Sequence, residues 1–254
     1  MQKITSINNK LISDTKLLHQ KKYRDRSGLF LAEGEKVLQE AISARLRIKA
    51  IFSNNETICQ KYPKENTFLV TEQIIKKLST TDTPPEVISV IEKPSFDTKN
   101  IDTGILILLD GIQDPGNLGT IIRAASAFDV KAILLSGETV DVYNPKVVRS
   151  TVGNLWKLPV LKISKGNIKQ QFPKHKLIAT TLDKTRKPAP FYKIKEEDNL
   201  LIMFGSEASG LSEEVMNQAD MFVDIPMKKN VESLNLSVSA GIIMQYFYMK
   251  RALE

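Results

Sequence analysis

The chain has 254 residues, of which 42% are hydrophobic and 26% charged, a balance typical of a globular protein of one or two domains. Its single cysteine, Cys59, excludes an internal disulfide and suits a reducing compartment. The chain has no run of about 18 apolar residues that would predict a membrane helix. The first ten residues lack a secretory signal, so we expect a cytoplasmic protein. The net charge of +7 indicates a polyanionic partner, either nucleic acid or an anionic membrane surface.

Residues 1–93 hold 16 Lys and Arg against 11 Asp and Glu, so +5 of the net charge of +7 lies here. Helices are predicted from apolar spacing and from caps such as Thr71, and strands from short apolar runs. In chain order the predicted elements are a helix over 14–21, a strand over 28–32, a helix over 33–45, strands over 48–53 and 67–70, a helix over 72–78 and a strand over 87–91. This alternation indicates a small α/β domain.

Residues 94–104 are predicted to form a linker, because Pro, Ser, Asp and Asn cluster at its start. Beyond the linker, continuous apolar runs indicate strands buried on both faces of a parallel sheet. The predicted strands cover 105–109, 132–135, 177–180, 200–204 and 221–225, and the predicted helices cover 118–128, 145–155, 212–218 and 236–250. The predicted fold class of residues 105–254 is therefore α/β, a doubly wound parallel sheet with a ligand at the carboxyl ends of its strands.

Two polar loops directly follow predicted strands. The first, DGIQDPGNLG at 110–119, has the residues of a tight turn before a helix that carries Arg123 among apolar neighbours. The second, GSEASG at 205–210, contains Glu207 between glycines that allow the backbone to approach a ligand. It matches neither a dinucleotide fingerprint nor a P-loop, because Leu211 and Ser212 stand where the latter has Lys and Ser or Thr. The ordinary alternatives are that Arg123 is simply an exposed arginine and that Glu207 is simply a solvated loop acid.

A third loop follows the last predicted strand, with the sequence NVESLNLSVS at 230–239. Ser233 and Asn235 are both good helix N-caps, which is their simplest structural role. One helix needs only one cap, so the additional polar residues indicate a further role for this loop.

Together the three loops resemble the motifs of the SpoU (TrmH-like) branch of the SPOUT RNA methyltransferases. The matching segments are DPGNLGTIIRAASAFDV at 114–130, LIMFGSEASGLSEEV at 201–215 and DIPMKKNVESLNLSVSAGIIMQYF at 224–247. The likeness covers roughly residues 105–250. Residues 1–93 resemble the L30e-like substrate-binding extension of such enzymes, through KKYRDRSGLFLAEGEKVLQEAI at 21–42.

The resemblance implies an α/β fold with a deep carboxyl-terminal trefoil knot and a homodimer whose active site lies at the subunit interface. It also implies that S-adenosyl-L-methionine is the cofactor. The positions that match family contacts to this cofactor are Thr181, Leu182, Gly205, Ile225 and Leu234. Those that match the family's catalytic set are Asn117, Arg123, Glu207, Ser233 and Asn235.

The implied reaction is methyl transfer from a sulfonium to a ribose 2′-hydroxyl, for which alignment of the reacting atoms matters most. The resemblance assigns proton removal to Arg123, although a guanidinium stays protonated in proteins. We therefore expect Arg123 to bind an RNA phosphate and to stabilise the developing alkoxide. Asn117, Ser233 and Asn235 are expected to orient the ribose, the cofactor or Arg123, and Glu207 to fix a nearby cation.

Lys21, Lys22, Arg24 and Arg26 form the densest basic run of the first domain, with Tyr23 between them. We expect this run to bind RNA phosphates, with a solvated charged face as the alternative. We expect neither a metal nor a membrane partner, since the two histidines lack ligand partners at metal spacing.

Ribosomal RNA is the preferred substrate, and transfer RNA is the alternative, because the L30e-like extension resembles that of ribosomal enzymes. A non-catalytic RNA-binding or ribosome-assembly factor on the same fold remains a second interpretation. An α/β enzyme with another adenosyl ligand is a third, which the absence of GxGxxG and P-loop motifs disfavours.

Overall fold

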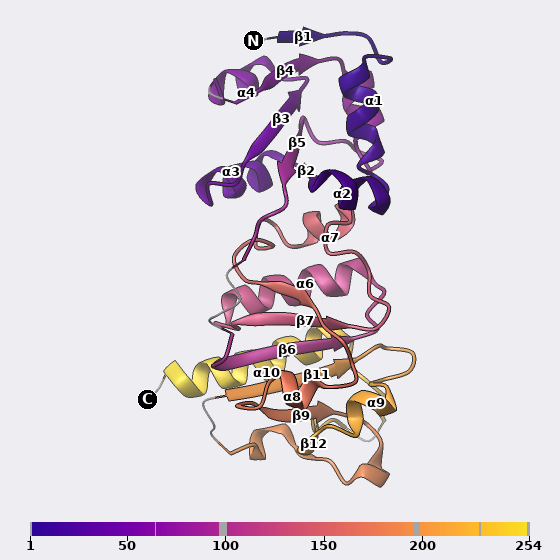
Figure 1. Ribbon diagram of the computed structural model, residues 1–254, viewed down its shortest axis with the longest axis vertical. Coiled ribbons are helices and arrows are strands. Elements are labelled where there is room, and N and C mark those ends of the chain that lie inside the picture. Colours follow the sequence, from indigo (N-terminus) through magenta and orange to yellow (C-terminus); the bar gives the residue numbers. More distant parts are fainter. Residues whose placement is uncertain (1, 64, 97–100, 196–198, 229, 253–254) are drawn as a thin grey trace. The chain divides into compact units, whose positions relative to one another are not determined.

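The computed structural model, drawn in Figure 1, describes residues 2–63, 65–96, 101–195, 199–228 and 230–252. Its contacts divide the chain into two compact units. The first unit comprises residues 1–95 together with residues 141–156, and the second comprises residues 96–140 and 157–254. The first unit is therefore discontinuous in sequence, because residues 141–156 follow the first part of the second unit but belong to the first unit.

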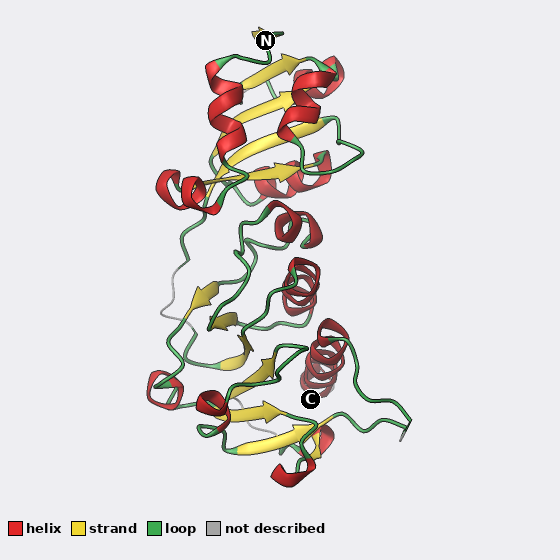
Figure 2. Cartoon of the chain, turned by 90° about the vertical axis from the view of Figure 1, so that its right-hand side faces the viewer, coloured by secondary structure: helices red, strands yellow, loops and turns green. Residues whose placement is uncertain are grey.

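The first unit contains a five-stranded mixed sheet in the order β1-β4-β3-β5-β2. Figure 2 draws strands in yellow and helices in red. Its strands are β1 (Gln2–Ile4), β2 (Leu29–Glu33), β3 (Ile48–Ser53), β4 (Thr67–Val70) and β5 (Val87–Glu92). Its helices are α1 (Lys10–Leu17), α2 (Lys21–Ser27), α3 (Glu35–Ser43), α4 (Glu56–Lys61), α5 (Glu72–Leu78) and α7 (Pro145–Ser150). β5 runs antiparallel to β2 and β3, whereas β3 pairs with β4 in parallel.

Alternate residues of this sheet bury their side chains against α1 and α5. Phe52, Ile88 and Val90 on the strands pack with Ile12 of α1 and Ile74 of α5 in one apolar cluster. A strand presents every second side chain to the same face. The alternate residues Phe30, Ile51 and Ile91 are also fully buried, so both faces of this sheet are covered. The predicted strands over 48–53 and 67–70 and the predicted helix over 72–78 are confirmed with the same bounds.

The single helix predicted over 14–21 is wrong, because two helices meet in this region. α1 begins earlier, where the Asn9 side chain accepts a hydrogen bond from the Leu11 backbone N–H at 2.8 Å. The chain then turns, and Arg24 Nη1 of α2 donates to the carbonyls of Leu18 at 2.7 Å and His19 at 2.8 Å. These contacts join a side chain of α2 to the carbonyls just after α1, a feature that helix propensity does not predict.

The second unit contains a seven-stranded sheet in the order β10-β12-β9-β11-β6-β7-β8, in which every strand pair is parallel. Its strands are β6 (Gly104–Asp110), β7 (Ala132–Ser136), β8 (Val160–Lys162), β9 (Lys176–Thr180), β10 (Ala189–Pro190), β11 (Asn199–Gly205) and β12 (Met221–Asp224). Its α-helices are α6 (Pro115–Ala127), α8 (Ile168–Gln171), α9 (Glu213–Met216) and α10 (Leu236–Ala252), and its 3₁₀ turns are η1 (Lys184–Arg186) and η2 (Phe191–Lys193). The predicted parallel α/β sheet is confirmed.

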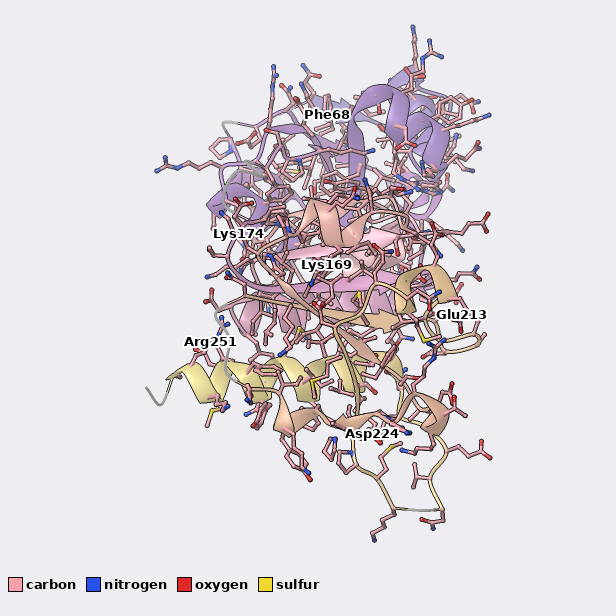
Figure 3. All side chains as sticks on the ribbon, turned by 60° about the horizontal axis from the view of Figure 1, so that its bottom comes forward. Phe68, Lys169, Lys174, Glu213, Asp224 and Arg251 are labelled. Atoms are coloured by element: carbon pink, nitrogen blue, oxygen red, sulfur yellow. The ribbon has the colours of Figure 1, made fainter. Side chains whose placement is uncertain are left out.

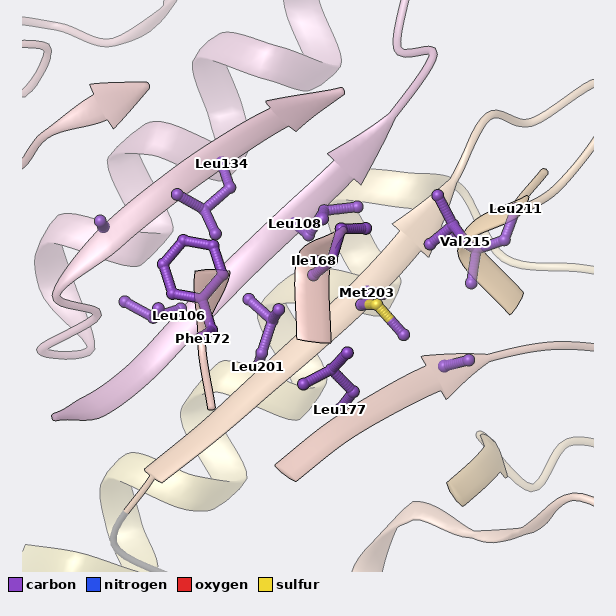
Figure 4. Close-up of a cluster of buried hydrophobic side chains, with 12 residues drawn as sticks. Leu106, Leu108, Leu134, Ile168, Phe172, Leu177, Leu201, Met203, Leu211 and Val215 are labelled. Carbon is purple, nitrogen blue, oxygen red and sulfur yellow. The ribbon is translucent and has the colours of Figure 1, made fainter. Parts of the chain in front are cut away.

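The strands of this sheet are buried, as their continuous hydrophobicity predicted. On one face Leu108, Leu134 and Met203 pack with Ile168 of α8 and Val215 of α9 (Figure 4). α6 and α10 contact each other and bury their own apolar residues. The sequence did not predict β1, α4, β8 or α8, each of six residues or fewer, and α7 ends at Ser150 instead of residue 155. Short elements show too few periods for a pattern to predict them.

The adjacent strands β12, β9, β11 and β6 run in parallel, so their carboxyl ends share one edge of the sheet. The loops that leave these ends contain the three predicted motifs and residues 181–183. In a parallel sheet this edge is where ligands bind. Within the described residues, no helix is long and apolar enough to cross a membrane.

Candidate functional site

Three of the predicted catalytic side chains meet at the carboxyl edge of the second sheet. The Asn117 amide donates a hydrogen bond to Glu207 Oε1 at 2.7 Å. The Asn235 amide donates to Asn117 Oδ1 at 3.0 Å and to the same Glu207 oxygen at 3.1 Å. The three residues come from α6, from the loop after β11 and from the residue before α10. We call this arrangement the polar triad.

The first residues of α6 position Asn117. Asp114 caps the helix by accepting a hydrogen bond from the Asn117 backbone N–H at 2.7 Å, and Pro115 occupies the first turn. This combination is a strong start signal for a helix, because it satisfies a free N–H and fixes the backbone angle of the proline. The Asn117 side chain is buried at 8% exposure, so its amide is held inside the site.

Asn235 is both a helix cap and a member of the triad. Its Oδ1 accepts hydrogen bonds from the backbone N–H groups of Ser237 at 2.9 Å and Val238 at 3.3 Å, at the start of α10. Its amide N–H groups remain available for Asn117 and Glu207. The capping role predicted for this residue is therefore correct, and the side chain joins the triad with its other end.

The loop that carries Glu207 folds back on itself. The backbones of Ser206 and Gly210 exchange two hydrogen bonds, at 3.1 and 2.9 Å. A Cβ on Gly205 would lie 1.9 Å from the carbonyl carbon of Gly210 and 2.0 Å from the nitrogen of Leu211. Only glycine fits this close approach of two backbone segments. The folded loop presents Glu207 at its tip.

Asp110, the last residue of β6, anchors both ends of this loop. It pairs with Gly205 in the strand ladder, and its Oδ2 accepts hydrogen bonds from the Ser212 backbone N–H at 3.0 Å and hydroxyl at 2.6 Å. Lys165 Nζ lies 2.7 Å from Asp110 Oδ1, to which Ser136 also donates. Burial alone would raise the pKa of Asp110, but the Lys165 ammonium and the hydrogen bonds from Ser212 hold it below its ordinary value.

A cavity of about 400 Å³ opens beside the triad, and we call it the cofactor cavity. It contains all five predicted cofactor-binding residues, which are Thr181, Leu182, Gly205, Ile225 and Leu234. Phe204, Leu211 and Val223 give it apolar walls, and Glu207, Asp183 and Asp224 give it carboxylates. Its volume lies in the usual range for a small-molecule site.

The loop after β9 forms one side of the cofactor cavity and is tied down by ion pairs. Lys184 Nζ lies 2.5 Å from Asp224 Oδ2, and Arg186 Nη2 lies 2.6 Å from Glu213 Oε2. Figure 3 labels the two carboxylates, which lie at the end of β12 and in α9. These basic side chains therefore have partners within the unit.

Ser233 and Arg123, the other two predicted catalytic residues, lie apart from the triad. Ser233 is exposed and lines the cofactor cavity. Arg123 is an exposed residue of α6 and is absent from the lining of both cavities beside the triad. The structure of one chain thus brings four of the five residues to the cavity and its border, and leaves Arg123 outside.

Arg24 is not an exposed RNA ligand, and this prediction is corrected. Its side chain is 2% exposed, and its Nη2 lies 2.5 Å from Asp141 Oδ2 within the first unit. The hydrogen bonds to the carbonyls of residues 18 and 19 use further donors, so Arg24 is structural. Lys21 and Arg26 are exposed, Lys21 pairs with Asp25, and Lys22 Nζ lies 4.8 Å from the ring centroid of Tyr23. Binding of RNA phosphates by these three residues stays a prediction.

The sequence missed Asp110 and Lys165. A buried acid at the last position of an apolar strand was a usable signal for Asp110, because such a charge needs partners. Lys165 gave no signal, since its partner lies in a distant loop. Within the described residues, no group of three metal-ligating side chains gathers anywhere.

A parallel sheet with a cavity at its strand ends defines the class of α/β proteins that bind a ligand there. Comparison with known families places the chain within this class. It belongs to the SpoU rRNA methylase family, whose model matches residues 104–245. The model of an MRM3-like substrate binding domain matches residues 9–89.

Known proteins match nearly the whole chain. The chain is 29% identical to the 23S rRNA (guanosine(2553)-2′-O)-methyltransferase RlmP of Bacillus subtilis, over 97% of this chain and 99% of the relative. It is 28% identical to the 23S rRNA (uridine(2479)-2′-O)-methyltransferase of Streptomyces viridochromogenes, over 96% and 90%. Among solved structures, the AdoMet-bound rRNA methyltransferase from Sinorhizobium meliloti matches with a TM-score of 0.85 and 28% identity, over 100% of this chain and 98% of that chain.

Proposed function

We propose that the chain transfers a methyl group from S-adenosylmethionine to a ribose 2′-hydroxyl of RNA, with ribosomal RNA as its substrate. The observation that carries the proposal is the cofactor cavity directly beside the polar triad, since Glu207 belongs to both. The names of the two rRNA relatives support the substrate class. Transfer RNA remains the alternative substrate.

The residues of the cofactor cavity suit this cofactor. The apolar walls accept the adenine ring. Because Gly205 has no Cβ, the loop that carries Glu207 stays folded back beside the ligand. Asp183 and Glu207 supply negative charge, whereas Asp224 is already paired with Lys184; this charge complements the sulfonium and the ammonium group of S-adenosylmethionine. Ser233 adds a hydroxyl at the border.

When bound, S-adenosylmethionine would supply an activated methyl group: its carbon–sulfur bond would break as the carbon–oxygen bond forms, and the hydroxyl proton would pass to solvent water. The protein must hold the ribose oxygen in line with the methyl group. Asn117 and Asn235 fix Glu207 through Oε1, and within the described residues no hydrogen bond reaches its Oε2. We assign this oxygen the task of orienting the ribose hydroxyl. Arg123 then stabilises the charge that develops on the oxygen.

We also propose a homodimer in which each chain supplies Arg123 to its partner's cavity. Support comes from the exposed position of Arg123 and from an apolar stripe on α10, where Val238, Ile242 and Met249 are 48%, 37% and 45% exposed. These residues lie on one side of the helix, as an interface requires. α6, which carries Arg123, contacts α10.

A mixed-dimer experiment tests this arrangement. Asn117→Ala and Arg123→Ala are each expected to inactivate the enzyme, and equal mixing of the two with subunit exchange is expected to restore about a quarter of the activity. One site of each mixed dimer would then combine an intact Asn117 with an intact Arg123. If Arg123 acts within its own chain, the mixture stays inactive. Methyl transfer to RNA is the measurement. The control is the Arg123→Ala variant alone, taken through the same subunit-exchange procedure.

Three further features belong to the proposal. The trefoil knot follows from the family resemblance. The cytoplasmic location rests on Cys59, a free and buried cysteine, which suits a reducing compartment. The patch of Lys21, Lys22 and Arg26 binds RNA phosphates, which the match of residues 9–89 to a substrate-binding domain supports.

The function is tested by incubating the protein with methyl-labelled S-adenosylmethionine and unmodified 23S ribosomal RNA. Label is expected in RNA as 2′-O-methyl nucleosides after digestion. A protein that binds the RNA and the cofactor without transferring label would be the non-catalytic RNA-binding factor instead.

A further inference from the structure

A second cavity, of about 460 Å³, lies on the other side of the Glu207 loop. Ser206, Glu207, Ser209, Gly210 and Leu236 line both this cavity and the cofactor cavity. Asn117 of the polar triad lines the second cavity. Two spaces of ligand size thus meet at the groups that the proposed function places beside the methyl group and the ribose.

On the basis of that proposed function, we propose that the second cavity receives the base of the target nucleotide and selects guanine through Glu138. Sequence-specific RNA recognition commonly uses an unstacked base, which a pocket can read along its Watson–Crick edge. The volume of the second cavity lies in the range of ligand pockets.

The charge of the second cavity decides which part of a nucleotide it can hold. Its lining contains four carboxylates, those of Asp110, Asp114, Glu138 and Glu207, against the single ammonium of Lys165. A phosphate would be repelled from such a lining, because like charges close together are unfavourable. A base edge that donates N–H groups is attracted. The phosphates of the RNA therefore remain outside the cavity.

Three of these four carboxylates already have partners. Asp110 binds Ser212 and Lys165, Asp114 caps α6, and Glu207 holds the two amides of the triad. Glu138, in the loop after β7, has no hydrogen bond or ion pair within the part of the chain that the structure describes. The backbone hydrogen bond from Val140 N–H to the Ile112 carbonyl, at 2.8 Å, holds this loop against the loop after β6.

A free carboxylate favours one base over the other three. Its two oxygens accept two parallel N–H bonds, and guanine presents adjacent donors, N1–H and the 2-amino group, on its Watson–Crick edge. Adenine, cytosine and uracil each place an acceptor beside the donor, and that acceptor would face a carboxylate oxygen. The names of the two rRNA relatives differ in the base, guanosine in one and uridine in the other, so they leave this choice open.

The first experiment identifies the methylated nucleoside. Unmodified 23S ribosomal RNA is treated with methyl-labelled S-adenosylmethionine and digested to nucleosides, and the label is expected in 2′-O-methylguanosine. Label in another 2′-O-methyl nucleoside would overturn the guanine inference and leave the proposed function standing. A lack of transfer, or label on a base, would instead contradict the proposed function and remove the basis of this inference.

A second experiment measures base recognition without methyl transfer. Saturation-transfer NMR is expected to show guanosine binding about tenfold more tightly than uridine or inosine, since inosine lacks the 2-amino group. Glu138→Gln is expected to remove this preference and to raise the KM for RNA about tenfold, with the Kd for S-adenosylmethionine unchanged. Asp129→Asn, an exposed acid outside both cavities, is the matched control. Equal binding of guanosine and inosine would refute the role of Glu138.

Discussion

Gly205→Ala is expected to weaken the binding of S-adenosylmethionine by roughly 100-fold, about 3 kcal/mol. The new Cβ would lie 1.9 Å from the backbone of Gly210, and backbone atoms cannot move aside as the end of a flexible side chain can. The loop must open, and both the cavity wall and the position of Glu207 change with it. Isothermal titration calorimetry with the cofactor gives the measurement.

Gly241→Ala is the matched control for this substitution. Gly241 lies in α10, and a Cβ built on it meets no atom within 4 Å. Alanine favours a helix over glycine by about 1 kcal/mol, so this variant is expected to bind the cofactor normally. An unchanged Kd in Gly205→Ala would show that the folded loop is not part of the cofactor site.

Arg24→Gln is expected to destabilise the first unit by about 3–5 kcal/mol. The substitution removes the cation beside Asp141, whose side chain is 13% exposed, and leaves a nearly buried carboxylate without its partner. Trp156 is the single tryptophan of the chain and belongs to the first unit. Its fluorescence during urea unfolding therefore reports the stability of this unit.

The neighbouring Arg26 provides the control, because it lies two residues along the same helix and is exposed. Arg26→Gln is expected to change the unfolding free energy by less than about 0.5 kcal/mol. The double variant Arg24→Gln/Asp141→Asn should recover part of the loss, since no unpaired charge remains. A single Arg24→Gln variant as stable as the unchanged protein would contradict the structural role of this arginine.

The sequence predicted the features that depend on local pattern. The apolar runs at 48–53 and 67–70 became strands with those bounds, and the strand-end position of the motif loops predicted that Asn117, Glu207 and Asn235 would come together. The alternation of strands and helices predicts parallel strands, whose carboxyl ends share one edge, so this edge could be expected from the sequence, whereas the strand order was not predicted.

What the sequence could not predict depends on partners far apart along the chain. Asp141, which pairs with Arg24, lies 117 residues beyond it. The basic run over 21–26 has too few neighbouring acids to pair with every charge, and it was therefore interpreted as an RNA-binding patch. Lys165 reaches Asp110 from another loop in the same way. Charge pairs of this kind have no periodicity, and tertiary packing alone decides them.

The return of residues 141–156 to the first unit has a consequence for how the chain is made. During synthesis, residues 1–95 emerge from the ribosome well before residue 141 does. Arg24 therefore has no counterion while β6 and β7 emerge. The first unit therefore completes its core only after about 60 further residues have been added, and at ordinary elongation rates this delay lasts several seconds. A fragment that stops at residue 95 would lack this closing segment for its whole lifetime, which makes the amino-terminal unit a poor candidate for transplantation into another protein.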